Sequence, residues 1–262
     1  MASKIKNLAR LLDSVNNKLT PDQDFIGDLK RSIELTEKKN VHKPSLTYKP
    51  SSMKCIRNMY YQVTGAEVDK EDTSYCIIGI LNSGTDIHVR IQTAIEQMKD
   101  NGIDCEYVDV AQFIRDRGLS DEIDIVDKSG METKLYHKSL NISCMSDGII
   151  RYKGHYYIIE LKTENSYKFS MRKDVDEGHY AQGTAYSYIL KLPEVIFVYI
   201  NRDNLDMKAF MFKPTEEMKQ DLVNRIIDCD GYKERKEVPP KPDNLPRNQC
   251  AYCGYRKLCE ND

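Results

Sequence analysis

A hairpin between residues 143 and 162 limits most strongly what this chain can fold into. The run Tyr156–Lys162, YYIIELK, is dominated by aromatic and β-branched residues and follows Gly154, so it is expected to form a strand. A turn at Lys153 and Gly154 would pair this strand with a preceding one that covers residues 143–152. The sequence therefore predicts two antiparallel strands at this point.

Three side chains of this hairpin are candidate catalytic or metal-binding groups. Alternate residues of a strand face the same side, so the carboxylate of Glu160 and the ammonium group of Lys162 project together. The turn brings Asp147 of the preceding strand close to them. Two carboxylates beside a lysine are suited to a divalent cation with a polarised water. The alternative is a solvated E-x-K pair on an exposed strand.

Composition narrows the class of protein. The chain has 262 residues, 31% of them charged, and a formal net charge of -2, so no global basic field indicates a nucleic-acid partner. No apolar run approaches the length of a transmembrane helix, and the N-terminus lacks the apolar core of a secretory signal. A cytoplasmic protein is expected, in which the eight cysteines stay reduced.

The remaining pattern predicts an α/β protein in three parts. Residues 1–45 are expected to be a helical extension, with helices over 3–40 broken at Thr20 and Pro21. Residues 46–230 form the expected core, and residues 231–262 a linker and a cysteine-rich tail. Expected helices cover 82–100, 111–117, 174–192 and 215–227, and expected strands cover 105–108, 122–126, 134–137, 195–200 and 207–212.

Two helices carry further polar candidates. His88 falls in the first turn of the helix expected from residue 82; a histidine there is usually a surface or capping residue, although imidazole is also a good metal ligand. Gln182 and Tyr186 are four residues apart and therefore share one helix face. The simpler interpretation of Gln182 is an exposed amide on an amphipathic helix.

The C-terminal tail has a metal-binding spacing. Cys250 and Cys253 form a C-x2-C pair, and Cys259 follows after five residues. A fourth ligand would come from Cys55, Cys76, Cys105, Cys144 or Cys229. Cys76 and Cys144 lie in apolar, strand-like contexts and are expected in the core. Spacing alone leaves an iron–sulfur cluster and zinc close to even.

Taken in order, these elements resemble a known family. The sequence presents Cys55, GTDIH with His88, Asp147, E-L-K with Glu160 and Lys162, QGTAY with Gln182 and Tyr186, and then Cys250, Cys253 and Cys259. This order resembles the RecB-like branch of the PD-(D/E)xK nucleases, and within it the iron–sulfur members: the CRISPR-associated RecB-like exonucleases, the nuclease domain of AddB and their phage-encoded relatives. The resemblance covers residues 51–259, with Ser146 in place of the motif's proline; residues 1–50 lie outside it.

The resemblance implies a fold and a set of roles. The fold would be restriction-endonuclease-like, with a central mixed sheet flanked by helices. His88, Asp147 and Glu160 would bind Mg2+ or Mn2+ together with the backbone carbonyl of Leu161, and Lys162 would orient or polarise the attacking water. Gln182 and Tyr186 would position the DNA strand. A [4Fe-4S] cluster would be held by four cysteines: Cys55, Cys250, Cys253 and Cys259.

The implied function is a metal-dependent DNA exonuclease that acts on single-stranded ends in recombination, repair or phage DNA processing. Its partner would be DNA, with a helicase or recombination protein as a further partner and no membrane, in the cytoplasm or, for a phage protein, the host cytoplasm. Basic and aromatic residues could contact a strand, although each taken alone is more often an ordinary surface residue: Arg57, Tyr60, Tyr61, Lys168, Arg172 and Lys173. Two alternatives are an inactive nuclease-fold module that binds DNA or a partner, and a zinc-stapled interaction protein.

Overall fold

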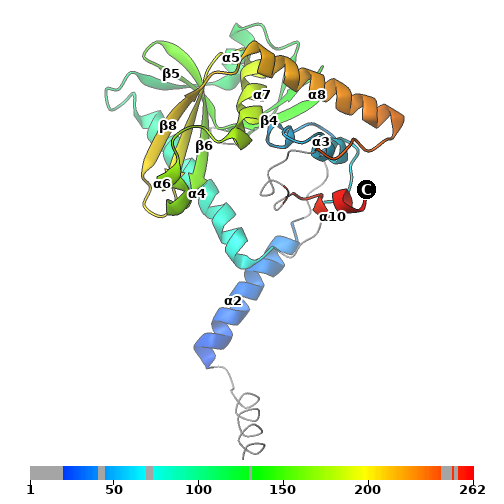
Figure 1. The fold of residues 1–262 in the computed structure, drawn as a ribbon. Helices are drawn as coiled ribbons and strands as arrows, with labels where there is room; N and C mark the ends of the chain where they lie inside the picture. Colours follow the sequence, from blue (N-terminus) through cyan, green and yellow to red (C-terminus); the bar gives the residue numbers. More distant parts are fainter. Residues whose placement is uncertain (1–19, 41–44, 69–72, 130–131, 243–249, 251–252) are drawn as a thin grey trace, which may run out of the picture. The chain divides into compact units, whose positions relative to one another are not determined.

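The computed structural model describes residues 20–40, 45–68, 73–129, 132–242, 250 and 253–262. Within these ranges the chain forms two compact units, one from residues 20–40 and 73–81 and the other from residues 45–68 and 82–262 (Figure 1). The helix expected over residues 3–19 lies outside the described residues, as does part of the expected linker at 243–249. No described helix is long and apolar enough to span a bilayer.

The smaller unit is built from helices. Helix α2 (Pro21–Lys38) begins where the sequence predicted, at Thr20 and Pro21, and the backbone N–H of Thr20 donates to Gln23 Oε1 at 3.1 Å. Helix α4 (Tyr75–Gln97) also begins in this unit, where the N–H of Tyr75 donates to Glu34 Oε1 at 3.0 Å. The start of α2 at Pro21 therefore agrees with the capping pattern of the sequence.

Helix α4 starts earlier than predicted. The expected start at residue 82 and the placement of His88 in the first turn are wrong, because the helix begins at Tyr75 and His88 lies in its middle. Gly84 lies inside this helix, where the helix approaches a strand: a Cβ there would lie 3.3 Å from Thr163 Oγ1. Cys76 lies on the exposed part of α4, so its expected place in the core is also wrong.

The larger unit is organised around a five-stranded mixed sheet in the order β1-β5-β6-β7-β8. Its strands are β1 (Cys105–Val108), β5 (Gly148–Tyr152), β6 (His155–Glu164), β7 (Val195–Asn201) and β8 (Met207–Phe212). Only the β6–β7 pair is parallel. The predicted turn between β5 and β6 is confirmed, and Lys153 and Gly154 both adopt positive φ angles there.

A second, three-stranded antiparallel sheet precedes the hairpin. It consists of β2 (Ile123–Ser129), β3 (Glu132–His137) and β4 (Ile142–Ser146), in that order. The expected single strand over 143–152 is therefore wrong: the chain leaves the small sheet after Ser146 and joins the large sheet at Gly148. Asp147 is the residue between the two sheets.

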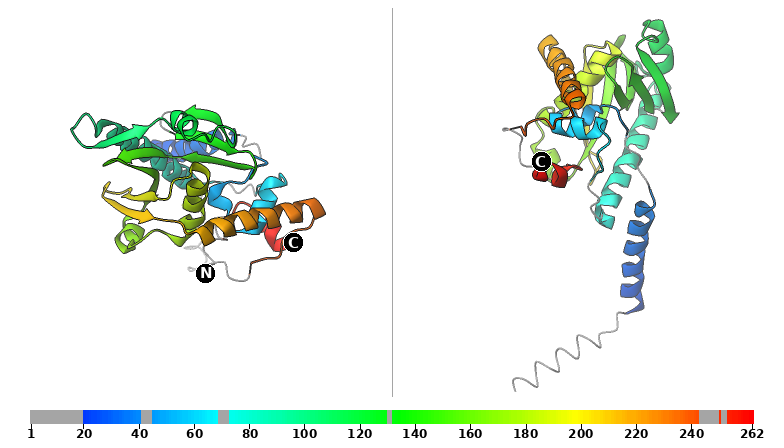
Figure 2. Two further views of the ribbon diagram at one scale, coloured as in Figure 1. Left: turned by 90° about the horizontal axis from the view of Figure 1, so that it is seen from above. Right: turned by 90° about the vertical axis from the view of Figure 1, so that its right-hand side faces the viewer.

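Helices cover both faces of the five-stranded sheet, as Figures 1 and 2 show. On one face, Ile87 of α4 packs with Ile159 and Leu161 of β6. On the other, Ala185 and Ile189 of α7 (Tyr180–Leu190) pack in a larger core that includes strand residues of both sheets. The predicted α/β fold with a mixed sheet flanked by helices is thus confirmed.

The remaining helices complete the larger unit. They are the 3-10 helix η1 (Pro50–Ser52), α3 (Ile56–Val63), α5 (Val110–Asp116), α6 (Ser166–Met171), the 3-10 helix η2 (Glu177–His179), α8 (Glu216–Arg235) and α10 (Arg256–Asn261). Helix α6 occupies a stretch expected to be loop, and α7 starts six residues later than expected because Asp176 accepts a hydrogen bond from Gly178 N–H and caps η2 first. Helix α8 runs beyond residue 227, so the expected linker from 231 begins only after Arg235.

Candidate active site and cysteine pocket

Asp147 stands where two ladders of paired residues end. In the small sheet the last pair of the β3–β4 ladder is Thr133 with Ser146, so the next position would place Asp147 opposite Glu132. In the large sheet the first pair of the β5–β6 ladder is Gly148 with Ile159, so the preceding position would place Asp147 opposite Glu160. Cross-strand neighbours lie about 5 Å apart. The strand switch therefore brings two other carboxylates to Asp147.

Hydrogen bonds fix the Asp147 carboxylate and its backbone. Its Oδ1 lies 3.1 Å from His88 Nδ1, and its Oδ2 accepts from the backbone N–H of Leu161 at 2.7 Å. The Asp147 carbonyl accepts from Gln92 Nε2 at 3.2 Å and from the Tyr107 hydroxyl at 2.8 Å. His88 and Gln92 are four residues apart on α4, so one face of that helix holds both ends of Asp147.

Gly148 permits this arrangement. Its φ angle is 141°, and a Cβ at this position would lie 1.8 Å from the Tyr107 hydroxyl oxygen. Any larger residue would displace Tyr107 from the Asp147 carbonyl. A glycine directly after Asp147 is thus required by the close approach of β1.

On the next strand, Glu160 and Lys162 face the same side, as predicted. Lys162 Nζ lies 2.7 Å from Glu160 Oε1 and donates to Gln182 Oε1 at 2.9 Å, and Gln182 Nε2 donates to the same Glu160 oxygen at 2.7 Å. Gln182 also contacts the Tyr186 hydroxyl at 3.0 Å, and that hydroxyl donates to the carbonyl of Met145 at 2.7 Å. The E-x-K motif is therefore not a solvated surface pair.

One oxygen of this network, Glu160 Oε2, has no hydrogen-bond partner among the described residues. Glu160 is only 4% exposed. A buried carboxylate oxygen without a partner is costly unless a proton or a cation satisfies it. Gln182, at 9% exposed, is also buried, so the interpretation of an exposed amide is wrong.

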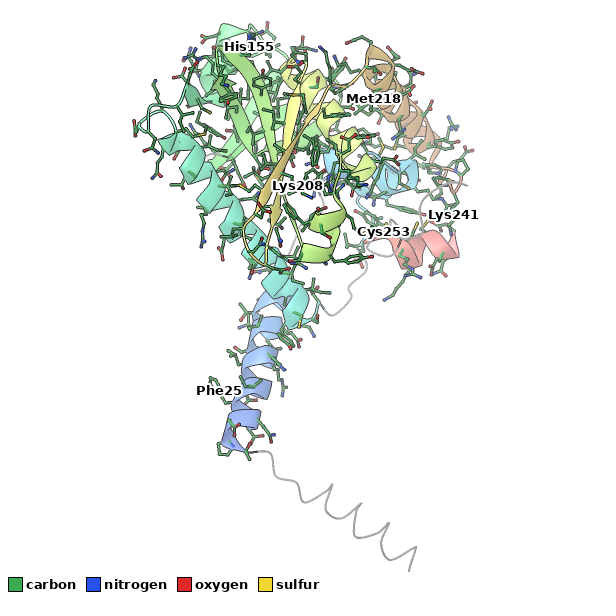
Figure 3. The ribbon with its side chains drawn as sticks, turned by 60° about the vertical axis from the view of Figure 1, so that its left-hand side comes forward. Phe25, His155, Lys208, Met218, Lys241 and Cys253 are labelled. Carbon is green, nitrogen blue, oxygen red and sulfur yellow. The ribbon has the colours of Figure 1, made fainter. Side chains whose placement is uncertain are left out.

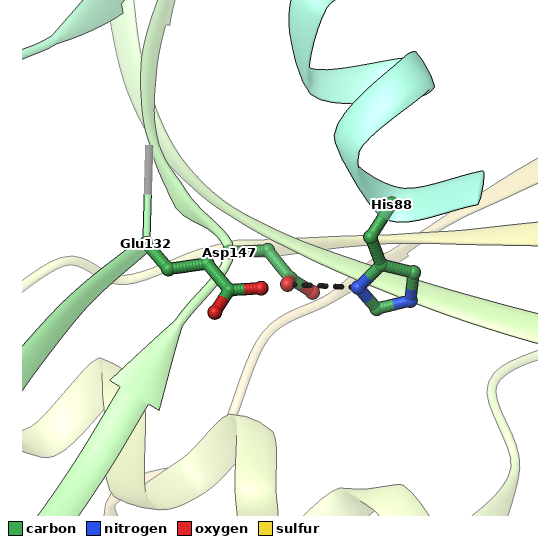
Figure 4. A group of neighbouring side chains, drawn as sticks. All are labelled: His88, Glu132 and Asp147. Atoms are coloured by element: carbon green, nitrogen blue, oxygen red, sulfur yellow. Dashed lines mark hydrogen bonds and ion pairs between the residues drawn. The ribbon is translucent and has the colours of Figure 1, made fainter. Parts of the chain in front are cut away.

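Glu132 is a residue of this site that the sequence analysis missed. One ligand atom each of His88, Glu132 and Asp147 can be chosen so that all lie within 4.8 Å of one another. Figure 4 shows the Glu132 carboxylate pointing toward Asp147, which lies between it and His88 in that view. The signal that could have found Glu132 is the register of the β3–β4 hairpin. Two carboxylates and an imidazole fit a hard divalent cation such as Mg2+ or Mn2+.

Electrostatics of the site reflect crowded acidic groups. Burial raises the pKa of Glu160 to about 7, opposed by Lys162 and supported by Asp147. Burial also raises the pKa of Glu132, with a further contribution from Asp147. For His88, burial lowers the pKa, but its hydrogen bond with Asp147 and the negative charges of the site outweigh that effect and leave the pKa above its usual value. A cation would relieve this repulsion.

The four cysteines of the predicted cluster line one pocket. Cys55, at the start of α3, shares a cavity of about 500 Å3 with Cys250, Cys253 and Cys259 of the tail. Each of the eight cysteines in the chain is described and is free of disulfide bonds. Figure 3 shows Cys253 and Lys241, two residues of this pocket, on the side of the tail. Four thiols around one cavity suit either zinc or an iron–sulfur cluster.

Helix α3 anchors the tail around this pocket. Arg57 Nη1 donates to the carbonyl of Cys259 at 2.9 Å and to its Sγ at 3.3 Å, and Asn58 Nδ2 lies 3.4 Å from Cys253 Sγ. The Tyr61 hydroxyl donates to Asp262 Oδ2 at 2.7 Å. Arg57, Tyr60 and Tyr61 are buried, so their expected role of contacting a nucleic-acid strand is wrong.

A second cleft, of about 1150 Å3, lies beside the start of α7 and shares Asn58 and Cys253 with the cysteine pocket. Its lining includes Lys54, Tyr167, Lys168, Lys173 and His179. Tyr167 and Lys173 are exposed, whereas the expected strand-contacting residue Arg172 is held in ion pairs with the carboxylates of Glu164 and Asp176. The lining also includes the acidic residues Asp174, Asp176 and Glu177, and it includes neither Glu160 nor Lys162.

Comparisons with known proteins give only distant similarities. No family model and no curated protein matches the sequence. Among solved structures, an alkaline exonuclease from Laribacter hongkongensis is 11% identical, with 74% of this chain and 90% of that chain covered and a TM-score of 0.43. The protein SSO0001 is 15% identical over 90% of this chain and 96% of that chain, with a TM-score of 0.44. A candidate exonuclease from Eubacterium rectale is 13% identical over 79% and 88%, with a TM-score of 0.39. These similarities are too weak to assign a family.

Proposed function

We propose that this chain is a divalent-metal-dependent deoxyribonuclease of the RecB-like iron–sulfur branch of the PD-(D/E)xK nucleases. One observation carries the proposal: Asp147, Glu160 and Lys162 converge where two sheets meet, and Glu160 Oε2 is buried with no partner among the described residues. A structural ion pair would satisfy both carboxylate oxygens. In a cation-binding site without its cation, one carboxylate oxygen is expected to have no protein partner.

The residues proposed to hold Mg2+ or Mn2+ are His88, Asp147, Glu160 and the carbonyl of Leu161. A bound divalent cation would neutralise charge on the phosphodiester and lower the pKa of water near it. The protein supports this chemistry by orienting its ligands. Asp147 is held by the N–H of Leu161, and its carbonyl is held from α4 and β1, so little reorganisation is needed when the site is filled.

Lys162 is proposed to orient or polarise the attacking water. Its ammonium group is fixed between two oxygens, Glu160 Oε1 and Gln182 Oε1, and its side chain is 21% exposed. A lysine in this position presents a fixed positive charge toward the substrate phosphate and can also take part in proton transfer.

Gln182 and Tyr186 are proposed to position the DNA strand. Both side chains are buried, so we expect them to act indirectly. They hold Lys162 and Glu160, which in turn face the nucleotide. The Tyr186 hydroxyl in turn is held by the carbonyl of Met145 in β4. This chain of hydrogen bonds joins α7 to the strand that leads into Asp147.

The proposed substrate is DNA with single-stranded ends, cleaved as an exonuclease would. What supports a strand route is the polar cleft beside α7, where Lys54 and Lys173 offer positive charge and Tyr167 an exposed ring. Lysines contact phosphates without sequence preference, and aromatic rings stack on bases. Lys168 also lines the cleft, although it is paired with Glu164 and Asp176.

We also propose that the cysteine pocket holds a [4Fe-4S] cluster on Cys55, Cys250, Cys253 and Cys259. Support comes from four free thiols around one cavity, with Arg57 and Asn58 donating to two of the sulfurs. N–H groups that point at cluster sulfurs stabilise the negative charge of thiolates. Zinc is the competing occupant.

Nuclease activity tests the first proposal directly. End-labelled linear and circular single-stranded DNA and linear duplex would be incubated anaerobically with Mg2+ or Mn2+. Wild type is expected to shorten linear single strands and spare circles, and Asp147→Ala and Lys162→Ala to lose about 10²–10⁴-fold of the rate. Lys99→Ala, which removes an exposed ion pair with Glu106, is the control. An inactive wild type would exclude the nuclease, and undiminished rates in both variants would exclude this site.

Metal content tests the second proposal. Protein purified anaerobically is expected to be brown, with broad visible absorbance and about four irons per chain. Replacement of Cys55 by serine should remove the colour, because Cys55 is the proposed ligand from outside the tail and the tail sequence contains no fourth cysteine. A colourless protein that contains one zinc per chain would overturn the cluster.

A further inference from the structure

Glu132 is a side chain that neither the motif nor the proposed ligand set uses. We infer that Glu132 is a fourth side-chain ligand of the divalent cation bound by His88 and Asp147. This inference rests on the proposed function, because it concerns the same cation. It adds a carboxylate from the small sheet to a site otherwise built from α4, the β4–β5 junction and β6.

The geometry of three side chains carries the inference. Atoms of His88, Glu132 and Asp147 that can bind a metal all lie within 4.8 Å of one another. Ligands of one Mg2+ or Mn2+ lie about 2.1 Å from the ion, so any two of them are at most about 4.2 Å apart. Small side-chain movements are sufficient to bring the three onto a single ion. Figure 4 shows Glu132 reaching this point from β3.

The position of Glu132 is set by the backbone. The β3–β4 ladder ends with Thr133 opposite Ser146, and Glu132 and Asp147 are the next residues on each strand. The carboxylate of Glu132 therefore does not depend on a flexible loop to reach the site. Two carboxylates held side by side repel each other unless a cation lies between them.

A second observation points independently to a cation. Glu160 is nine-tenths or more buried, and its Oε2 finds no partner in the described part of the chain. Glu160 lies within electrostatic range of both Asp147 and His88. Glu132 and Asp147 thus lie beside the imidazole of His88, and the neighbouring Glu160, which is outside that group of three, pairs through one oxygen with Lys162.

This ligand set has a consequence for selectivity. His88 alone among the ligands supplies nitrogen, and each added carboxylate favours a hard, oxygen-seeking ion. With Glu132 bound, Mg2+ and Mn2+ would each keep fewer water ligands. Binding of the cation would also join the small sheet to the large one through side chains, in addition to the backbone at Asp147.

Calorimetric titration of Mn2+ and Mg2+ tests the inference without an activity assay. The full-length protein is used with its cysteine site loaded, after Mg2+ and Mn2+ have been removed. Glu132→Gln is expected to weaken Mn2+ binding by at least about tenfold, the lower end of the loss seen when even groups behind the ligands are removed. Glu132→His should restore affinity for Mn2+ while Mg2+ binding stays weak, because imidazole is a poorer ligand for Mg2+. A purely structural role for Glu132 would not produce this difference between metals.

The matched control is Asp124→Asn, which removes an exposed carboxylate from the same small sheet, where it pairs with Lys138. Its metal affinity should equal that of wild type. If wild type binds Mn2+ and Glu132→Gln binds it equally well, Glu132 is not a ligand and the proposed nuclease site stands. If wild type binds no divalent cation, the proposed function itself fails. Melting of each variant in EDTA verifies that all are folded.

Discussion

The carboxylate site and the cysteine pocket are assembled in different ways. At the carboxylate site, protein groups already hold the ligands: Leu161 and His88 contact Asp147, and Gln182 contacts Glu160. At the cysteine pocket, segments far apart in the chain meet, as Asn58 and Cys253 do across 195 residues. The first site is preorganised by two sheets, whereas the second is closed by a tail that side chains of α3 hold in place.

This difference separates two uses of a metal. Where ligands are held by a folded framework, the framework folds without the cation, and the cation mainly supplies chemistry. Where ligands come from distant segments, binding of the metal group contributes directly to the free energy of folding. Removing the group at each location should therefore affect activity in one case and stability in the other.

The largest effect on stability is expected at the cysteine pocket. Cys253→Ser should lower the free energy of unfolding by about 2–5 kcal/mol, the range for loss of a native cross-link between distant segments. For a domain of this size the melting temperature would fall by roughly 5–15 °C. Thermal unfolding of the anaerobically purified protein measures this fall in melting temperature. Cys76→Ser, an exposed thiol outside the pocket, is the control, and equal melting of both variants would show that the tail is held without the cluster.

The next effect is expected at Gly148. A Cβ there would overlap the Tyr107 hydroxyl at 1.8 Å, so Gly148→Ala should cost about 2–4 kcal/mol and reduce Mn2+ affinity as Asp147 shifts. Gly154→Ala is a matched control, because Gly154 also has a positive φ, of 82°, but no atom lies within 4 Å of an added Cβ. Backbone strain alone would cost about 1 kcal/mol. Denaturant unfolding of both variants compares them, and equal losses would mean that the Tyr107 contact is unimportant.

The smallest effect concerns the charge of Glu160 in the metal-free protein. Its folded pKa is raised to about 7, so its contribution to stability is complete below the unfolded value of 4.5 and is lost as the pH rises through 7. In EDTA, Glu160→Gln should be more stable than wild type at pH 8 by about 1–2 kcal/mol and no more stable at pH 4. Saturating Mn2+ should reverse the order at pH 8. Denaturant unfolding curves at the two pH values measure the difference in free energy of unfolding between the two proteins. A difference that does not change with pH would contradict the raised pKa of Glu160.

Local sequence predicted the parts of this structure that depend on near neighbours. The turn at Lys153 and Gly154, the strand that carries Glu160 and Lys162, and the start of α2 at Pro21 each follow from residues within a few positions. Their side-chain directions are fixed by the alternation of a strand or by a helix cap.

Long-range pairing was harder to predict. Residues 143–152 look like one strand, since nothing at Asp147 marks the change of sheet, and the partner of β4 is β3 rather than β6. Glu132 was missed for the same reason, because its relevance depends on that pairing. Arg57 and Tyr61 look like surface residues until α3 is packed against the tail. Each error concerns a contact that local propensity does not encode.

The strand switch at Asp147 also restricts how the chain can change length. Successive residues of a strand face opposite sides, so inserting one residue in β4 would turn Asp147 away from Glu132 while leaving its register with Glu160 intact. An insertion in β5 would change the register of Asp147 with Glu160 and leave its register with Glu132 intact. Deletions and insertions near this point should therefore be tolerated far less than substitutions at neighbouring positions. The number of residues between Glu132 and Glu160 determines whether their carboxylates meet at Asp147.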